Sequence, residues 1–249
     1  MEQASVTDRK TGKQLDKLCE ELQRVFGEDL LSVVLYGSAA RSEDFAPGSD
    51  LNVLVVLKEI TLESLERGTA PTRRWETQGN RPLLFFSPEW IRRSSDVFPL
   101  EFLDIQESHR VLAGVDPFAG LDVPRENLRL QCESELKTKL IHLRTGYMEL
   151  HEDPEALSRL LASSYAPLVA ILRGALRITG SPVPARSEEV VASAAKACGL
   201  DPAPFLEVAA IRRGGVDAAS AKPVFKRYYA QMETLARFVD AGFTGGANR

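Results

Sequence analysis

The chain of 249 residues has little cysteine and little histidine. Its three cysteines, Cys19, Cys132 and Cys198, are too widely spaced for a disulfide framework or for the close pairs of a zinc site. Their apolar, helical surroundings predict reduced thiols inside a core. The three histidines have no partners at ligand spacing, so nothing supports a zinc enzyme or a Ser-His-Asp hydrolase.

Strong charge of one sign and long apolar runs are also missing. The formal net charge of −4 argues against broad nucleic-acid binding and favours small, diffusible substrates. No window approaches the roughly 18 apolar residues of a membrane span, and residues 1–12 are polar without an apolar signal region. These features predict a cytoplasmic protein without a membrane partner.

What is present is a change of hydrophobic period near residue 120. Before it, short apolar runs alternate with helical segments, and after it the pattern is helical throughout. The predicted fold class is therefore α+β: a small mixed β-sheet domain with helices on one side over residues 1–120, then an α-helical bundle over 121–249. Predicted strands are 31–36, 51–57 and 82–86. Predicted helices are 14–26, 61–76, a short one opening at 87–88, and then 125–147, 157–178, 188–198, 204–212 and 222–241.

The first predicted strand ends at Gly37-Ser38, and the second is preceded by Ser49-Asp50 and carries Asn52. Because side chains alternate along a strand, Asp50 and Asn52 should point the same way while their apolar neighbours enter a core. Polar side chains on a largely buried strand require a ligand or a partner. A glycine turn lets backbone N–H groups approach phosphate closely, and a carboxylate suits Mg²⁺.

At these residues the sequence resembles the nucleotidyltransferase superfamily, which includes the β-type DNA polymerases and the small bacterial aminoglycoside nucleotidyltransferases. Gly37-Ser38 and Ser49-Asp50 match its Gly-Ser and Ser-Asp-x-Asp signature, whereas Asn52 stands where the family has a second acid. The resemblance implies that residues 1–120 are a nucleotidyltransferase domain and that the bundle helps to bind the acceptor.

The same resemblance implies roles for individual residues. Gly37, Ser38, Arg41 and Ser49 would bind a nucleoside triphosphate, with ATP favoured, and Asp50 aided by Asn52 would hold Mg²⁺.

The family places a third carboxylate on a later strand, and residues 98–105 are predicted to form that strand. Glu101 and Asp104 are three residues apart there, so they would face opposite ways and only one would join Asp50. Glu101 is favoured as metal ligand and general base, and Asp104 remains the alternative. The side chains of Asp50, Asn52 and Glu101 are expected to converge in a cleft.

The resulting hypothesis is a Mg²⁺-dependent transfer of a nucleoside monophosphate from a triphosphate to an acceptor hydroxyl. A small molecule or a protein is favoured as the acceptor over RNA. The alternative is a catalytically impaired nucleotide-binding or partner protein that retains the fold. Asn52 motivates this alternative, because losing one preorganised electrostatic group typically costs about a hundred- to a thousandfold in rate.

Two weaker signals have ordinary structural interpretations. His109 could approach the site as a proton carrier, but it is more readily read as a satisfied structural residue. The run Lys226 to Tyr229 could meet phosphate and stack on a base, but aromatic residues in a terminal helix more often pack in a core.

Overall fold

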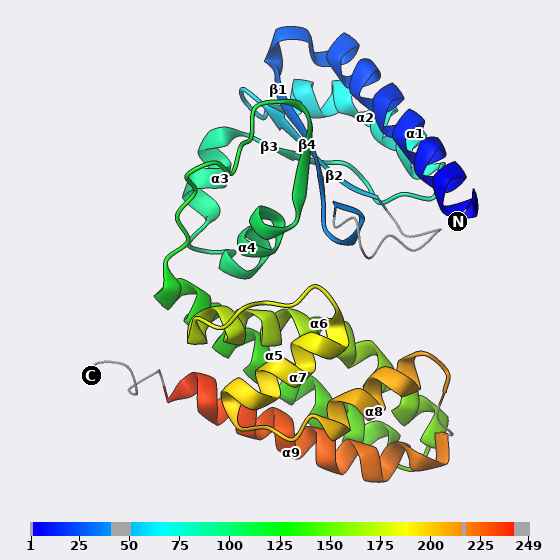
Figure 1. The fold of residues 1–249 in the computed structure, drawn as a ribbon, viewed down its shortest axis with the longest axis vertical. Helices are drawn as coiled ribbons and strands as arrows, with labels where there is room; N and C mark the ends of the chain where they lie inside the picture. Colours follow the sequence, from blue (N-terminus) through cyan, green and yellow to red (C-terminus); the bar gives the residue numbers. More distant parts are fainter. Residues whose placement is uncertain (1, 41–50, 216–217, 242–249) are drawn as a thin grey trace. The chain divides into compact units, whose positions relative to one another are not determined.

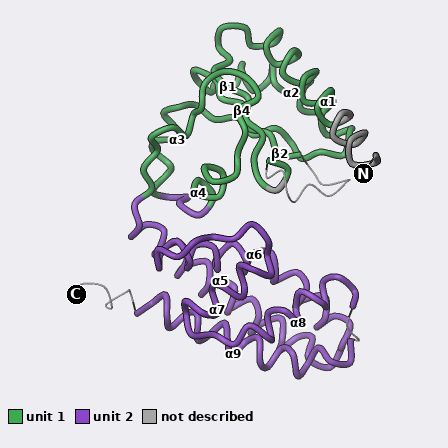
Figure 2. Tube along the Cα trace, in the orientation of Figure 1, with its two compact units in different colours: residues 1–96, 101–123 green, residues 97–100, 124–249 purple. Residues whose placement is uncertain are grey.

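The computed structural model describes residues 2–40, 51–215 and 218–241. They fall into two compact units, residues 1–96 with 101–123 and residues 97–100 with 124–249, which Figure 2 colours separately. The boundary predicted near residue 120 lies close to this division.

Over the described residues, the first unit contains a four-stranded sheet, three helices and all but the first two residues of a fourth, and the second contains five helices. In chain order the elements are α1 (Glu2–Phe26), β1 (Leu30–Tyr36), β2 (Asn52–Leu57), α2 (Leu62–Glu76), β3 (Leu84–Phe86), α3 (Pro88–Ser94), α4 (Pro99–Glu107), β4 (His109–Gly114), α5 (Arg125–Leu150), α6 (Pro154–Thr179), α7 (Ser187–Cys198), α8 (Ala203–Arg212) and α9 (Ala221–Asp240). Short 3₁₀ turns lie at Gly27–Asp29, Ser38–Ala40 and Ala218–Ser220.

The sheet is mixed, with strand order β3-β2-β1-β4. β1 pairs antiparallel with β2 and β4, and β3 runs parallel to β2. Tyr36, the last residue of β1, pairs with Asn52 at the start of β2 and with His109 at the start of β4. One end of β1 and the beginnings of two neighbouring strands therefore share one end of the sheet.

Helices cover both faces of this sheet, so the expectation of helices on one side was wrong (Figure 1). One face packs on α1 and α2 through Val33, Leu35, Val53, Val55 and Leu57, with Leu51 in the same core. The other face packs on α3 and α4 through Val34, Leu54 and Val56. The signal was present in the sequence, because residues 53–57 are apolar at consecutive positions, as expected of a strand buried on both sides.

The strand predicted over residues 98–105 is also wrong, because the segment forms helix α4. Pro99 occupies its first position, where the fixed φ of proline suits a helix. Phe102 and Ile105, three residues apart, both enter the core beneath the sheet. The fourth strand is instead β4, which no sequence pattern predicted.

Local capping sets the ends of several helices. Thr61 and Ser64 form a capping box at the start of α2, and the Ser87 hydroxyl caps α3 ahead of Pro88. Asp153 accepts a hydrogen bond from the backbone N–H of Ala156 at the start of α6. The starts of α2 and α3 agree with the predicted ones because capping depends on neighbouring residues, whereas α6 begins three residues before the predicted start at residue 157.

The second unit is organised around α6, which packs against α5, α7, α8 and α9. Pro167 lies inside α6 without ending it. By length and composition α6 would pass as a membrane span, which the sequence analysis did not expect, but 61% of the window is buried inside the protein. Such burial is what the central helix of a bundle shows.

Candidate functional site

Gly37 and Asn52, two of the predicted site residues, lie together at the shared end of β1 and β2. Gly37 has a φ of +79°, and its N–H donates to the carbonyl of Ser108 at 2.9 Å. A Cβ added at Gly37 would stand 3.2 Å from Nδ2 of Asn52. Both the backbone conformation and the closeness of the Asn52 amide therefore favour glycine here.

Asn52, Tyr36 and His109 form a polar row across the end of the sheet. Asn52 and Tyr36 are two residues from Leu54 and Val34, so they belong to the face that packs on α3 and α4. The apolar packing on this face ends at the row, since the side chains of Tyr36, Asn52 and His109 are all only partly buried. A bound molecule would meet these polar groups at the end of the sheet.

Tyr36 was not singled out from the sequence. Burial raises the pKa of its hydroxyl, and the positive charge of Arg81 acts in the opposite direction. Arg81 comes from the turn between α2 and β3 and is exposed. No sequence signal pointed to Arg81, because its nearness to Tyr36 arises only in the folded chain.

His109 is engaged through both ring nitrogens. Nδ1 lies 3.1 Å from the carbonyl oxygen of Ile105 and 3.0 Å from that of Gln106, and Nε2 lies 3.1 Å from Oδ1 of Asp116. Asp116 also accepts from the N–H of Phe118 at 2.9 Å. These contacts hold the start of β4 in place. They support a structural role for His109 and not the role of a proton carrier.

Glu101 and Asp104 have a different relation from the predicted one. On a helix, residues three apart lie on the same side, so the two carboxylates share one flank of α4 instead of facing opposite ways. Glu101 is exposed and Asp104 is partly buried. Of the described strands that follow β2, neither β3 nor β4 contains an Asp or Glu.

Arg41, Ser49 and Asp50 lie outside the described residues, and the backbone of Ser38 opens the turn Ser38–Ala40. The convergence of Asp50, Asn52 and Glu101 in a cleft therefore stays a prediction. Over the part of the chain that the structure describes, no group of three or more His, Cys, Asp or Glu could hold a metal ion. Asn52 offers an amide oxygen, and a Mg²⁺ ion that arrives with phosphate oxygens needs only one or two carboxylates besides.

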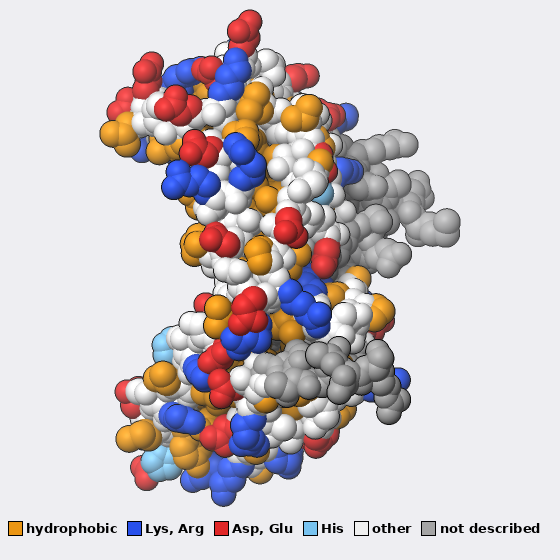
Figure 3. All heavy atoms as spheres, turned by 90° about the vertical axis from the view of Figure 1, so that its left-hand side faces the viewer, with side chains coloured by type: hydrophobic (Ala, Val, Ile, Leu, Met, Phe, Trp, Pro, Cys, Tyr) orange, Lys and Arg blue, Asp and Glu red, His pale blue; other side chains and the backbone are white. Residues whose placement is uncertain are grey.

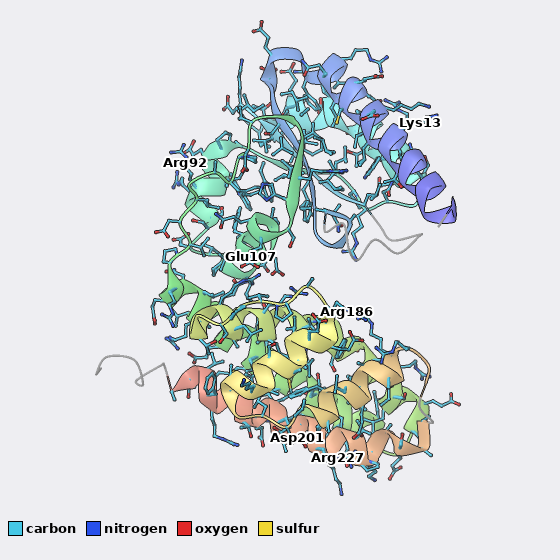
Figure 4. The ribbon with its side chains drawn as sticks, viewed as in Figure 1. Lys13, Arg92, Glu107, Arg186, Asp201 and Arg227 are labelled. Atoms are coloured by element: carbon cyan, nitrogen blue, oxygen red, sulfur yellow. The ribbon has the colours of Figure 1, made fainter. Side chains whose placement is uncertain are left out.

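The run Lys226 to Tyr229 has the packing role. Tyr228 is fully buried and shares a hydrogen bond of 2.9 Å with the hydroxyl of Ser164. Arg227, labelled in Figure 4, pairs with Glu207. On the face drawn in Figure 3, the described Lys and Arg side chains are interspersed with Asp and Glu, which agrees with the low net charge.

The α+β fold with a helical second unit, as predicted, has a counterpart among solved structures. The chain is similar to the crystal structure of spectinomycin adenyltransferase AAD(9) from Enterococcus faecialis with ATP and spectinomycin. The TM-score is 0.57 and the identity 13%, and the match covers 89% of this chain and 98% of that chain. No protein-family model and no curated protein sequence matches this chain.

Proposed function

We propose that this protein transfers a nucleoside monophosphate from a triphosphate, with ATP favoured, to a hydroxyl of a small molecule. The observation that carries the proposal is the contact of the Gly37 turn with Asn52 at the end of β1 and β2, in a fold similar to an adenyltransferase crystallised with ATP and spectinomycin. A protein acceptor is the second choice.

In this proposal each residue has a defined task. The backbone N–H groups that follow Gly37 hold the terminal phosphates, because a glycine turn exposes them without a Cβ in the way. Asp50 and Asn52 hold Mg²⁺, which would neutralise charge on the phosphates. Arg81, close enough to Tyr36 to affect its pKa, adds positive charge at the same end of the sheet.

Two carboxylates of α4, Glu101 and Asp104, are candidates for the general base. Glu101 keeps the first place as the proposed base, but both carboxylates lie on one flank of the helix. Glu101→Gln and Asp104→Asn separate them: the variant of the true base loses turnover by about 10² to 10⁴ while its affinity for ATP is retained. If neither variant loses turnover, the base is not on α4.

A second function is favoured by the acids that are missing. Asn52 stands where the resembled family has a second acid, and neither β3 nor β4 carries an Asp or Glu. A protein with this donor set would bind a nucleotide with little or no transfer, as a sensor or a partner protein does.

The deciding experiment is an ATP titration with and without Mg²⁺, followed by an assay for pyrophosphate release with spectinomycin and related aminoglycosides as acceptors. Acceptor-dependent release of pyrophosphate supports the transferase. Mg²⁺-dependent binding without release supports the second function, and no binding refutes both.

Two variants test the site itself. Asp50→Ala is expected to abolish Mg²⁺-dependent ATP binding. Glu59→Ala removes an exposed acid just beyond the opposite end of β2 and is expected to leave binding unchanged. Equal losses in the two variants would place the nucleotide elsewhere.

A further inference from the structure

Asn80 lies in the turn that leads from α2 to β3, and no motif pointed to it. Past the end of α2, Gly79 has a φ of +87°, and its N–H donates to the carbonyl of Glu76 at 2.9 Å. The tight turn directs the chain back, and the side chain of Asn80 is partly buried.

The carboxamide of Asn80 joins two backbone groups. Its Oδ1 accepts from the N–H of Leu51 at 3.3 Å, and its Nδ2 donates to the carbonyl oxygen of Trp75 at 3.3 Å. One partner is a donor and the other an acceptor, so the orientation of the amide is fixed by its partners. Leu51 and Trp75 are 3% and 1% exposed, so water has little access to either residue.

The bond to Leu51 lies where the sheet gives no support. Within the described residues, the pairing of β2 with β1 ends at Asn52, and the pairing with β3 begins only at Leu54. The N–H of Leu51 belongs to the peptide bond that links Asp50 to Leu51. Asn80 therefore does for this peptide what a neighbouring strand would do, and a buried N–H without an acceptor is costly.

We infer that Asn80 is a positioning residue for the candidate site: through Leu51 it fixes the start of β2, and so the placement of Asn52 against Gly37. The inference rests on the proposed function for its kinetic consequences only. It extends the support of the site to the turn that follows α2.

The test compares variants at Asn80 with a variant of similar structural cost. Asn80→Ala removes both hydrogen bonds, whereas Asn80→Asp keeps an oxygen for the N–H of Leu51 and loses the donation to Trp75. Thr61→Ala removes the capping hydroxyl at the other end of α2, where Oγ1 accepts from the N–H of Ser64 at 3.1 Å. Gln78→Ala removes an exposed amide from the same turn as Asn80.

Asn80→Ala is expected to lower kcat/KM and the affinity for Mg²⁺-ATP about tenfold, with partial recovery in Asn80→Asp. Thr61→Ala is expected to lower the melting temperature to a similar extent while kcat/KM stays unchanged, and Gln78→Ala to change neither. If Asn80→Ala behaves like Thr61→Ala, Asn80 is merely structural and the inference fails. It also fails if Asn80→Asp recovers nothing.

Hydrogen exchange separates this inference from the proposed function, because it needs no nucleotide. Asn80→Ala should speed amide exchange at Leu51 and Asn52 but not in the middle of β1. If the unmodified protein binds no nucleotide while exchange rises as expected, the proposed function is wrong and the positioning of the strand stands. Unchanged exchange at Leu51 overturns the inference whatever the nucleotide experiments show.

Discussion

Gly37→Ala tests the geometry of the candidate site most directly. At a φ of +79° a residue with a Cβ costs about 1–2 kcal/mol more than glycine. The new Cβ would also stand 3.2 Å from Nδ2 of Asn52, which must turn away, and an off-rotamer side chain costs about 0.5–1.5 kcal/mol. The expected loss in the free energy of unfolding is therefore about 1.5–3.5 kcal/mol.

Gly27→Ala is the matched control in the same unit. Gly27 has a φ of +56°, and an added Cβ would have no neighbour within 4 Å among the described residues. This variant should lose only the backbone part, about 1–2 kcal/mol.

Urea unfolding measures both variants, and Gly37→Ala combined with Asn52→Ala closes a double-mutant cycle with a coupling near 1 kcal/mol. Titration with Mg²⁺-ATP should show a loss of affinity in Gly37→Ala and none in Gly27→Ala. Equal stability losses together with zero coupling would refute the contact between Gly37 and Asn52. An unchanged affinity for ATP would remove the Gly37 turn from the nucleotide site.

Three further predictions concern the site, the bundle and a buried hydroxyl. Asn52→Asp should raise turnover at low Mg²⁺ by restoring a second carboxylate, and unchanged or lower turnover across a Mg²⁺ titration would show that the amide suits this chemistry. Gly174→Ala should destabilise by about 1–3 kcal/mol in urea unfolding, because its Cβ would lie 2.4 Å from Sγ of Cys132. Gly12 lies in helix α1, and a Cβ added there would have no neighbour within 4 Å among the described residues, so Gly12→Ala should raise the free energy of unfolding by about 0.5–1 kcal/mol. Equal changes in Gly174→Ala and Gly12→Ala would contradict the close packing of Gly174 against Cys132. Burial raises the pKa of the Tyr228 hydroxyl above its ordinary value of 10.0, so the stability that this protonated group contributes is complete below pH 10. Above pH 10 the free energy of unfolding should fall by about 1.4 kcal/mol per pH unit, because the unfolded chain loses the proton first. Tyr228→Phe should flatten this fall in alkaline unfolding experiments, and an unchanged slope would contradict the prediction.

Elements with local signals were predicted well. Helix α2 begins after Thr61, as its capping pattern indicates, and α3 begins at Pro88 after the capping residue Ser87. The Gly37 turn at the end of an apolar run also followed from neighbouring residues. In each case the controlling contacts lie within a few positions along the chain.

Elements that depend on distant partners were missed or misread. Residues 99–107 carry apolar side chains whose spacing admits a strand or a helix, and packing of Phe102 and Ile105 under the sheet selects the helix. β4 is weakly patterned and exists through its pairing with β1. Because this segment is a helix and not a strand, Glu101 and Asp104 lie on the same side of it instead of on opposite faces.

Sequence patterns alone were enough to predict the order of strand, Gly-Ser turn and second strand, the helical character of residues beyond about 120, and the starts of α2 and α3. Tertiary structure alone decided that the sheet is covered on both faces and that the Asn52 amide lies against Gly37. It also decided that Asn80 holds Leu51, 29 residues away in the chain. Periodicity and capping depend on residues close together in the sequence, so their patterns can be recognised there. Burial and hydrogen bonding across the sheet join residues far apart in the sequence, and no local pattern indicates which of them will meet.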